Sequence, residues 1–146
     1  MRNSRPLAVA ALVLCTLMGL MAADRLADPF PIPLSAAVYM EYWVQPLDDG
    51  IYTITDLSAV ERVLTCLNET GQGVRDFDAR RPSMMDRDYE IGFLRSDGGY
   101  FSLTVWGGAH TLELNMQESW VYQTDTDPLC ALLEEILEAR SSGMLE

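Results

Sequence analysis

The chain has no lysine, and all ten of its basic residues are arginine. The absence of lysine excludes a Schiff-base mechanism and a phosphate-binding P-loop, because both require the lysine amine. His110 is the only histidine, so a metal site built from several histidines is also excluded. The net charge of −12 argues against a nucleic-acid partner, since phosphate binding needs a basic surface.

The remaining composition fits one small folded domain. The chain has 146 residues, of which 49% are hydrophobic and 22% charged. This balance is typical of a globular protein rather than of a disordered chain. A chain of this length builds a single hydrophobic core.

Residues 1–23 are expected to form a signal peptide or a membrane anchor. Arg2 and Arg5 precede an uncharged run over residues 6–23, and all 22 acidic residues follow that run. As a helix the run would be about 27 Å long, close to the hydrocarbon thickness of a bilayer. The basic residues before it predict that the remainder of the chain lies outside the cytoplasm. The end of the run makes a poor cleavage site. A cleaved, secreted form and an uncleaved form held in the membrane through residues 6–23 therefore both remain open.

Residues 24–34 are expected to form a spacer between this segment and a domain. Prolines at positions 29, 31 and 33 favour an extended, semi-rigid chain that would hold the domain away from a membrane. Residues 35–146 are then expected to fold as a single extracytoplasmic domain.

Alternating apolar and polar residues predict several short strands. In residues 35–45, Met40 points to one side of the strand, whereas Tyr39 and Trp43 point to the other. Turns rich in glycine join the later strands into an antiparallel meander. The further candidate strands span residues 51–55, 74–79, 89–94, 100–106, 111–116 and 120–122.

Two segments carry apolar residues at the spacing of an amphipathic helix. The first is capped by Asp56 or Ser58 and ends at Gly71. The second begins at Asp127, with Pro128 in the first turn, where its missing N–H costs nothing. Because each helix has one apolar stripe, both are expected to pack on the same face of the sheet. The predicted fold is α+β: an antiparallel meander sheet with two helices on one face, preceded by an N-terminal hydrophobic helix.

This pattern resembles small uncharacterised extracytoplasmic domains of Gram-positive bacteria. The resemblance covers residues 50–140 and rests on a capped helix, a charged turn between two strands, and an aromatic strand that leads into a final helix. The N-terminal segment lacks the lipobox that many such chains carry. The resemblance implies an exported domain and transfers no functional residue. The three matching segments are residues 56–68, 88–106 and 120–137.

Aromatic residues suggest a binding surface. Tyr39 and Trp43 share one side of their strand, where they would form an exposed face that binds a protein, peptide or glycan. The alternative is that the aromatic rings fill the core between the sheet and the helices. The other aromatic residues of the predicted strands that bear on this choice are Tyr52, Tyr100, Trp106, Trp120 and Tyr122.

Cysteines and charged pairs offer further candidate sites. Cys66 and Cys130 lie one on each predicted helix and could form a disulfide outside the cytoplasm; otherwise they are buried free thiols. Arg80 and Arg81 are expected to balance the acidic residues near them in the sequence. The acidic pairs could bind Ca²⁺ through oxygen ligands, although none continues into a calcium-binding loop. They occupy positions 48–49, 76 and 78, 86 and 88, and 125 and 127.

Two functions from different classes follow. The favoured one is an exported, non-enzymatic interaction domain at the cell envelope that needs no cofactor. The alternative is a small cell-envelope hydrolase or metal-dependent enzyme that uses His110 and acidic residues. No catalytic residue and no metal ligand is assigned, because the sequence around His110 and the cysteines completes no catalytic set. The enzyme hypothesis requires at least two carboxylates and His110 to converge on one pocket.

Overall fold

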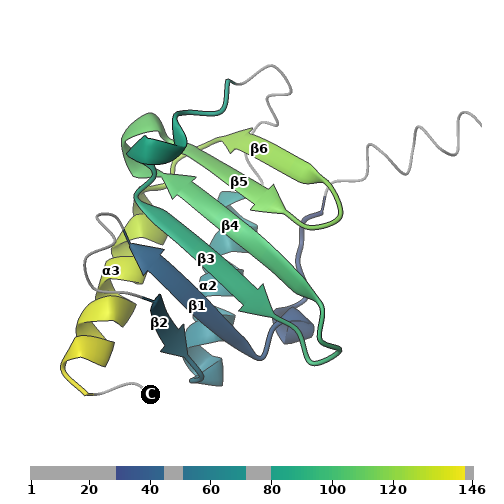
Figure 1. Cartoon of the computed structure of the whole chain (residues 1–146), viewed down its shortest axis with the longest axis vertical. Helices are drawn as coiled ribbons and strands as arrows, with labels where there is room; N and C mark the ends of the chain where they lie inside the picture. The colour runs from purple at the N-terminus through teal and green to yellow at the C-terminus, as the bar shows by residue number, and fades with distance from the viewer. Residues whose placement is uncertain (1–28, 45–50, 72–79, 144–146) are drawn as a thin grey trace, which may run out of the picture.

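The computed structural model describes residues 29–44, 51–71 and 80–143, and within these ranges the chain forms one six-stranded sheet and two α-helices (Figure 1). The α+β class and the antiparallel sheet are therefore confirmed. The predicted N-terminal helix and the strand over residues 74–79 lie outside the described residues. None of the described helices has the length and apolar character needed to cross a bilayer.

The strands are β1 (Tyr39–Val44), β2 (Ile51–Ile54), β3 (Tyr89–Leu94), β4 (Tyr100–Trp106), β5 (Thr111–Asn115) and β6 (Ser119–Gln123). The helices are α2 (Leu57–Thr70) and α3 (Asp127–Ser141), with short 3₁₀ helices η1 (Leu34–Ala36), η3 (Met84–Asp86) and η4 (Gly107–Ala109).

The order of the strands in the sheet is β2-β1-β3-β4-β5-β6, and every neighbouring pair is antiparallel. β1 and β2 form a hairpin, and α2 then carries the chain across to the other side of β1, where β3 pairs. From β3 to β6 the chain is a simple meander, as the turn residues predict. β1 is consequently an internal strand that pairs with both β2 and β3.

Both helices lie on the same side of the sheet, behind the strands in Figure 1, as expected from their single apolar stripes. Alternation along each strand sends every second side chain toward the helices. On this side the Phe93 and Phe101 rings stack with their centroids 4.7 Å apart. The fully buried residues of this core include Met40, Ile54, Val60, Val63, Leu64, Leu67, Ile91, Leu103, Val105, Leu112, Leu114, Tyr122, Leu129 and Leu133.

The helix termini follow the local sequence. Asp56, rather than Ser58, is the N-cap of α2, and its carboxylate accepts hydrogen bonds from the backbone N–H groups of Ser58 at 2.8 Å and Ala59 at 3.3 Å. Gly71 ends this helix with right-handed backbone angles, so the turn does not require a glycine there. The requirement is space, because a Cβ on Gly71 would lie 2.3 Å from the Phe30 ring.

The last part of the predicted spacer packs against the domain. Ile32 is buried, and the Asn68 side chain accepts a hydrogen bond from its N–H at 2.7 Å and donates one to its carbonyl at 2.8 Å. Phe30 meets Tyr122 edge to face, with ring centroids 5.2 Å apart. The packed unit therefore includes residues before position 35.

Residues 80–88 fold over part of the sheet face that the helices leave uncovered. Trp106 points to this face, yet it is only 1% exposed, and its indole N–H donates to the carbonyl of Ser83 at 2.9 Å. Glu113 is also on this face and 2% exposed, and it forms an ion pair with Arg81 and accepts a hydrogen bond from Ser119. Arg81 thus pairs with a carboxylate that is distant in the sequence; of the neighbouring acids expected to balance it, those at positions 76 and 78 lie outside the described residues.

We expect Arg81→Ala to lower the free energy of unfolding by about 1–3 kcal/mol, because it leaves the buried Glu113 carboxylate without its cation. The double variant Arg81→Ala, Glu113→Gln should recover part of this loss. Denaturation in urea measures both. The matched control is Arg62→Ala, since the Arg62–Glu135 pair is exposed on both sides and should contribute less than about 1 kcal/mol. Equal losses in Arg81→Ala and Arg62→Ala would contradict the role given to Glu113.

Candidate functional site

The aromatic residues of the strands divide between the core and the opposite face. Trp120 and Tyr122 are buried in the core between the sheet and the helices, as the core interpretation expects, whereas Trp106 is buried on the opposite face beneath residues 80–88. Tyr100 is 53% exposed. Among the described residues it is the one aromatic side chain that counts as an exposed large hydrophobic residue. Of the two residues predicted to bind a partner, Tyr39 is half-buried, and the side chain of Trp43 lies outside the described part of the chain.

Tyr100 lies at one end of the sheet face that the helices do not cover. Its partner across the β3–β4 ladder is Leu94, which in turn pairs with Tyr39 of β1. The ring of Tyr100 lies over Gly92, where an added Cβ would be 2.4 Å from the hydroxyl oxygen. Gly92 is therefore the position that lets this ring lie flat along the sheet. We call this surface, formed by Tyr39, Gly92, Leu94 and Tyr100, the open face.

Two carboxylates border the open face. Glu41 pairs with Gly92 across the β1–β3 ladder, and Glu90 lies two residues before Gly92 on β3. Burial, followed by the negative charges of Glu90 and Glu41, raises the pKa of Tyr100. The Arg87 guanidinium lies 3.0 Å from Glu90, whereas Glu41 forms no ion pair within the described residues. Glu41 thus places a negative charge beside an exposed ring, and no described arginine is paired with it.

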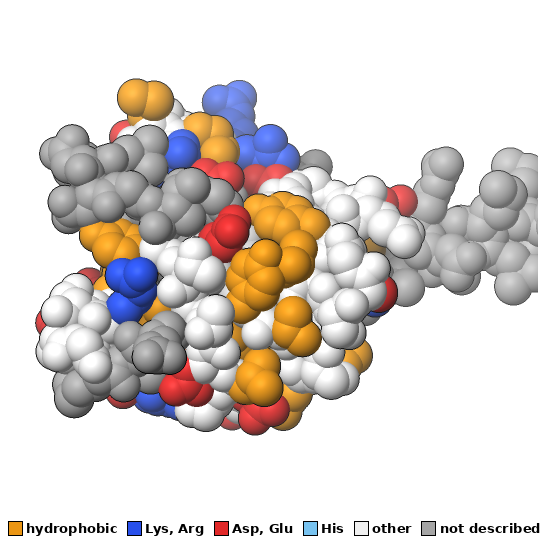
Figure 2. Space-filling model, turned by 60° about the horizontal axis from the view of Figure 1, so that its bottom comes forward, with side chains coloured by type: hydrophobic (Ala, Val, Ile, Leu, Met, Phe, Trp, Pro, Cys, Tyr) orange, Lys and Arg blue, Asp and Glu red, His pale blue; other side chains and the backbone are white. Residues whose placement is uncertain are grey.

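A groove continues from Tyr100 around the end of the sheet. It has a volume of about 650 Å³ and lies between the β3–β4 and β5–β6 turns, lined by Arg95, Tyr100, Met116 and Trp120 among others. A smaller hollow of about 240 Å³ shares the Arg95 and Met116 side chains and extends the groove toward Pro29. Figure 2 shows hydrophobic side chains gathered in one patch with acidic side chains at its margin. We call the larger hollow, together with its extension toward Pro29, the end groove.

The two cysteines of the helices are free thiols in the structure, so the predicted disulfide is not formed. Cys66 lines a shallow hollow on the outer side of α2 with Leu34 and Leu132. Cys130 instead lies close to Gly107 and Asp88 at the sheet end of α3. Burial, followed by the charge of Asp88, raises the pKa of Cys130 to about 11. Burial also raises the pKa of Cys66, so both thiols are protonated and poor nucleophiles near neutral pH.

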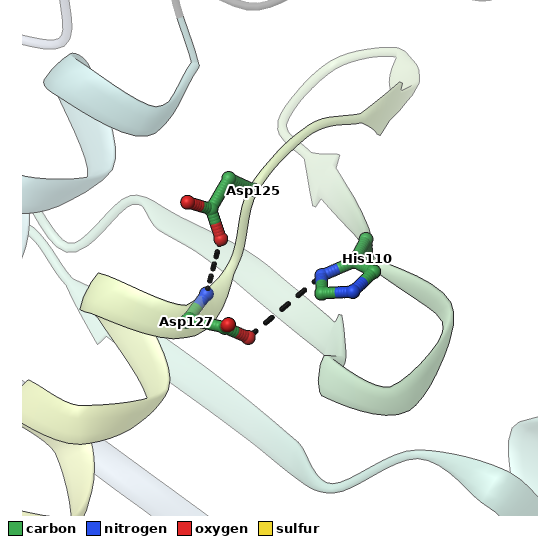
Figure 3. A group of neighbouring side chains, drawn as sticks. All are labelled: His110, Asp125 and Asp127. Atoms are coloured by element: carbon green, nitrogen blue, oxygen red, sulfur yellow. Dashed lines mark hydrogen bonds and ion pairs between the residues drawn. The ribbon is translucent and has the colours of Figure 1, made fainter.

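His110 meets two aspartates at the surface. Its imidazole Nδ1 lies 3.7 Å from a carboxylate oxygen of Asp127, and Asp125 completes a group of three (Figure 3). His110 also adopts the left-handed backbone conformation, with φ of 47°, which is uncommon for residues other than glycine. All three side chains are exposed, so the group lies on the surface and lacks the pocket that the enzyme hypothesis requires.

Comparison with known proteins adds nothing to this geometry: neither the protein-family models, nor the curated proteins, nor the solved structures contain a match to this chain. The resemblance to extracytoplasmic domains of Gram-positive bacteria therefore stays a prediction.

Sequence reasoning missed the carboxylates and the glycine that shape the open face. The available signal was Gly92 itself, because a glycine inside an alternating strand marks a close approach of another group. Glu113 gave no such signal, since an acidic residue at an alternating strand position normally faces water.

We expect Glu41→Gln to lower the pKa of Tyr100, because the variant removes a negative charge that opposes ionisation of the phenol. Gly92→Ala should lower it as well, since the new methyl group displaces the ring toward water. Carbon-13 NMR of labelled tyrosine side chains over a pH series measures both shifts. Glu61→Gln, on the exposed side of α2, is the matched control and should leave the Tyr100 titration unchanged. An unaltered Tyr100 pKa in both test variants would show that the ring does not lie between these groups.

Proposed function

We propose that this chain is a non-enzymatic interaction domain that acts outside the cytoplasm at the cell envelope, and that its open face and end groove bind a basic, extended segment of a partner protein. The observation that carries the proposal is the exposed Tyr100 ring beside the Glu41 carboxylate, which forms no ion pair with a described residue. The resemblance noted above and the uncharged run over residues 6–23 support the location.

The shape and polarity of the surface favour an extended peptide. Tyrosine is a frequent anchor of protein interfaces, because it buries a large apolar area and retains a hydroxyl for hydrogen bonding. The groove beside Tyr100 has a volume of about 650 Å³, and Met116 adds an adaptable apolar side chain to it. A peptide could therefore place one apolar side chain in the groove and continue along the open face.

The charge of the surface favours a basic segment. Glu41 lies beside the ring and has no ion-pair partner among the described side chains, and the chain as a whole carries a net charge of −12. The long-range field attracts a positively charged segment, whereas the local carboxylate sets where its arginine or lysine docks. Arg95 lies at the far side of the groove, paired with Asp97 at 2.8 Å, so its charge is already compensated.

The structure supports the interaction domain better than the enzyme alternative. The end groove is lined by aromatic and apolar side chains together with Arg95 and Glu118, and the one histidine lies elsewhere on the surface. The thiols are held protonated, which disfavours a cysteine nucleophile. The described residues thus provide a surface for recognition rather than a set of groups for bond cleavage.

The test is selection of binders from a random peptide library by the full-length chain held in detergent. We expect enriched peptides to combine lysine or arginine with an apolar or aromatic residue. Tyr100→Ala should weaken the best peptide by about tenfold or more, as for a central interface tyrosine. Glu41→Gln should also weaken binding of this peptide, and the loss should be smaller at high salt than at low salt, because salt screens the charge interaction.

The matched control is Leu57→Ala, which removes an exposed apolar side chain from the helix side of the domain. It should leave peptide binding unchanged. The proposal is overturned if selection yields no basic peptide, or if Tyr100→Ala and Leu57→Ala bind the selected peptide equally well. Binding of cell-wall oligosaccharides at Tyr100 without peptide binding would likewise replace the proposed partner by a glycan.

A further inference from the structure

His110, Asp125 and Asp127 come from two segments that the fold brings together. His110 follows η4, at the start of β5, whereas Asp125 and Asp127 precede and begin α3. One potential ligand atom from each of the three side chains lies within 4.8 Å of the other two. Figure 3 shows the imidazole and the Asp127 carboxylate turned toward each other, with Asp125 beside them.

Backbone hydrogen bonds fix the two segments relative to each other. The N–H of Thr124, next to Asp125, donates to the carbonyl of His110 at 2.9 Å. The N–H of His110 donates to the carbonyl of Gly107 at 3.0 Å, which holds the histidine at the end of its turn. The positions of the three Cα atoms are thus set by the fold, and only side-chain rotation separates the observed arrangement from a tighter one.

We propose that these three side chains bind a divalent first-row transition metal ion, for which Zn²⁺ is the best match. Imidazole nitrogen and carboxylate oxygen are both common zinc ligands. With zinc–ligand bonds of about 2.0 Å, neighbouring ligand atoms of a tetrahedral site lie about 3.3 Å apart. The separation of 3.7 Å between His110 and Asp127 is already near this value. Asp125 has to approach by a small rotation of an exposed side chain.

Helix capping accounts for only part of this group. The Asp125 carboxylate accepts the N–H of Asp127 at 3.0 Å, and an acidic residue in the first turn of α3 complements the helix dipole. His110 is not explained by capping, because it comes from the η4 turn and its imidazole lies 3.7 Å from the Asp127 side chain. The imidazole is the feature that points to a metal, since it adds a nitrogen ligand from a separate segment to two oxygen ligands.

A bound ion would connect the base of the β5–β6 hairpin to the start of α3. Three protein ligands leave at least one coordination position for water or for a ligand from another molecule. The site is exposed and distant in the fold from the open face, which lies at the β3–β4 turn. Its role is independent of the peptide-binding proposal, and either can fail without the other.

The test uses the full-length chain in detergent with Zn²⁺ as the probe. Because His110 is the only histidine, its ring protons give the only imidazole signals in the NMR spectrum. We expect Zn²⁺ to shift these signals and, at tenfold excess over the dissociation constant, to raise the melting temperature by about 5 °C or more. His110→Gln should abolish the thermal shift, although it leaves the capping carboxylates in place.

Two controls separate this site from other binding of the ion. Asp97→Asn removes an exposed turn carboxylate elsewhere and should keep the full zinc-dependent shift. A variant with Cys15, Cys66 and Cys130 changed to serine should also keep it, because the proposed ligands include no thiol. If the thermal shift survives in His110→Gln, or disappears with the cysteines, the ion binds elsewhere and the proposal is wrong. An equal shift with Ca²⁺ that does not depend on His110 would show charge screening alone.

Discussion

The burial of one sheet face by α2 and α3 is the interaction on which the rest of the structure depends. Leu64 and Leu133, one from each helix, are fully buried, as is Leu103 from the middle of the sheet. A sheet has two faces, however, and two helices on the same side leave the other one to the chain's remaining segments. Residues 80–88 cover the part near Trp106, and the part near Tyr100 stays open. The candidate binding surface is thus what the packing leaves uncovered.

The sequence predicted the elements whose signals are local. The apolar period of α2, its cap at Asp56 or Ser58 and the start of α3 at Asp127 depend on residues within a few positions of one another; the period and the start of α3 are confirmed, and the cap is Asp56. The strand order was not predicted, because the pairing of β1 with β3 joins residues about fifty positions apart. Strand signals in one sequence give each strand's faces but not its neighbours.

The open face could be predicted only in part. Alternation along β1 correctly placed Tyr39 on the side opposite Met40, which is buried against the helices. It could not decide which aromatic residues stay exposed, since Tyr100 and Trp106 alternate identically on β4. Trp106 is covered because the carbonyl of Ser83, more than twenty residues earlier, accepts its N–H. Exposure is therefore a property of long-range packing, which periodicity does not report.

The acidic residues illustrate why net charge alone does not identify a partner. Glu113 is buried and its charge is balanced by Arg81, while backbone N–H groups lower the pKa of Asp56 at the start of α2. Both carboxylates therefore interact with other groups of the same domain and stabilise its fold. Glu41 differs, because it has no ion pair within the described residues and lies beside an exposed tyrosine ring. Net charge therefore acts on any partner from the whole surface, whereas the position of a contact depends on individual carboxylates that are not paired within the described part of the fold.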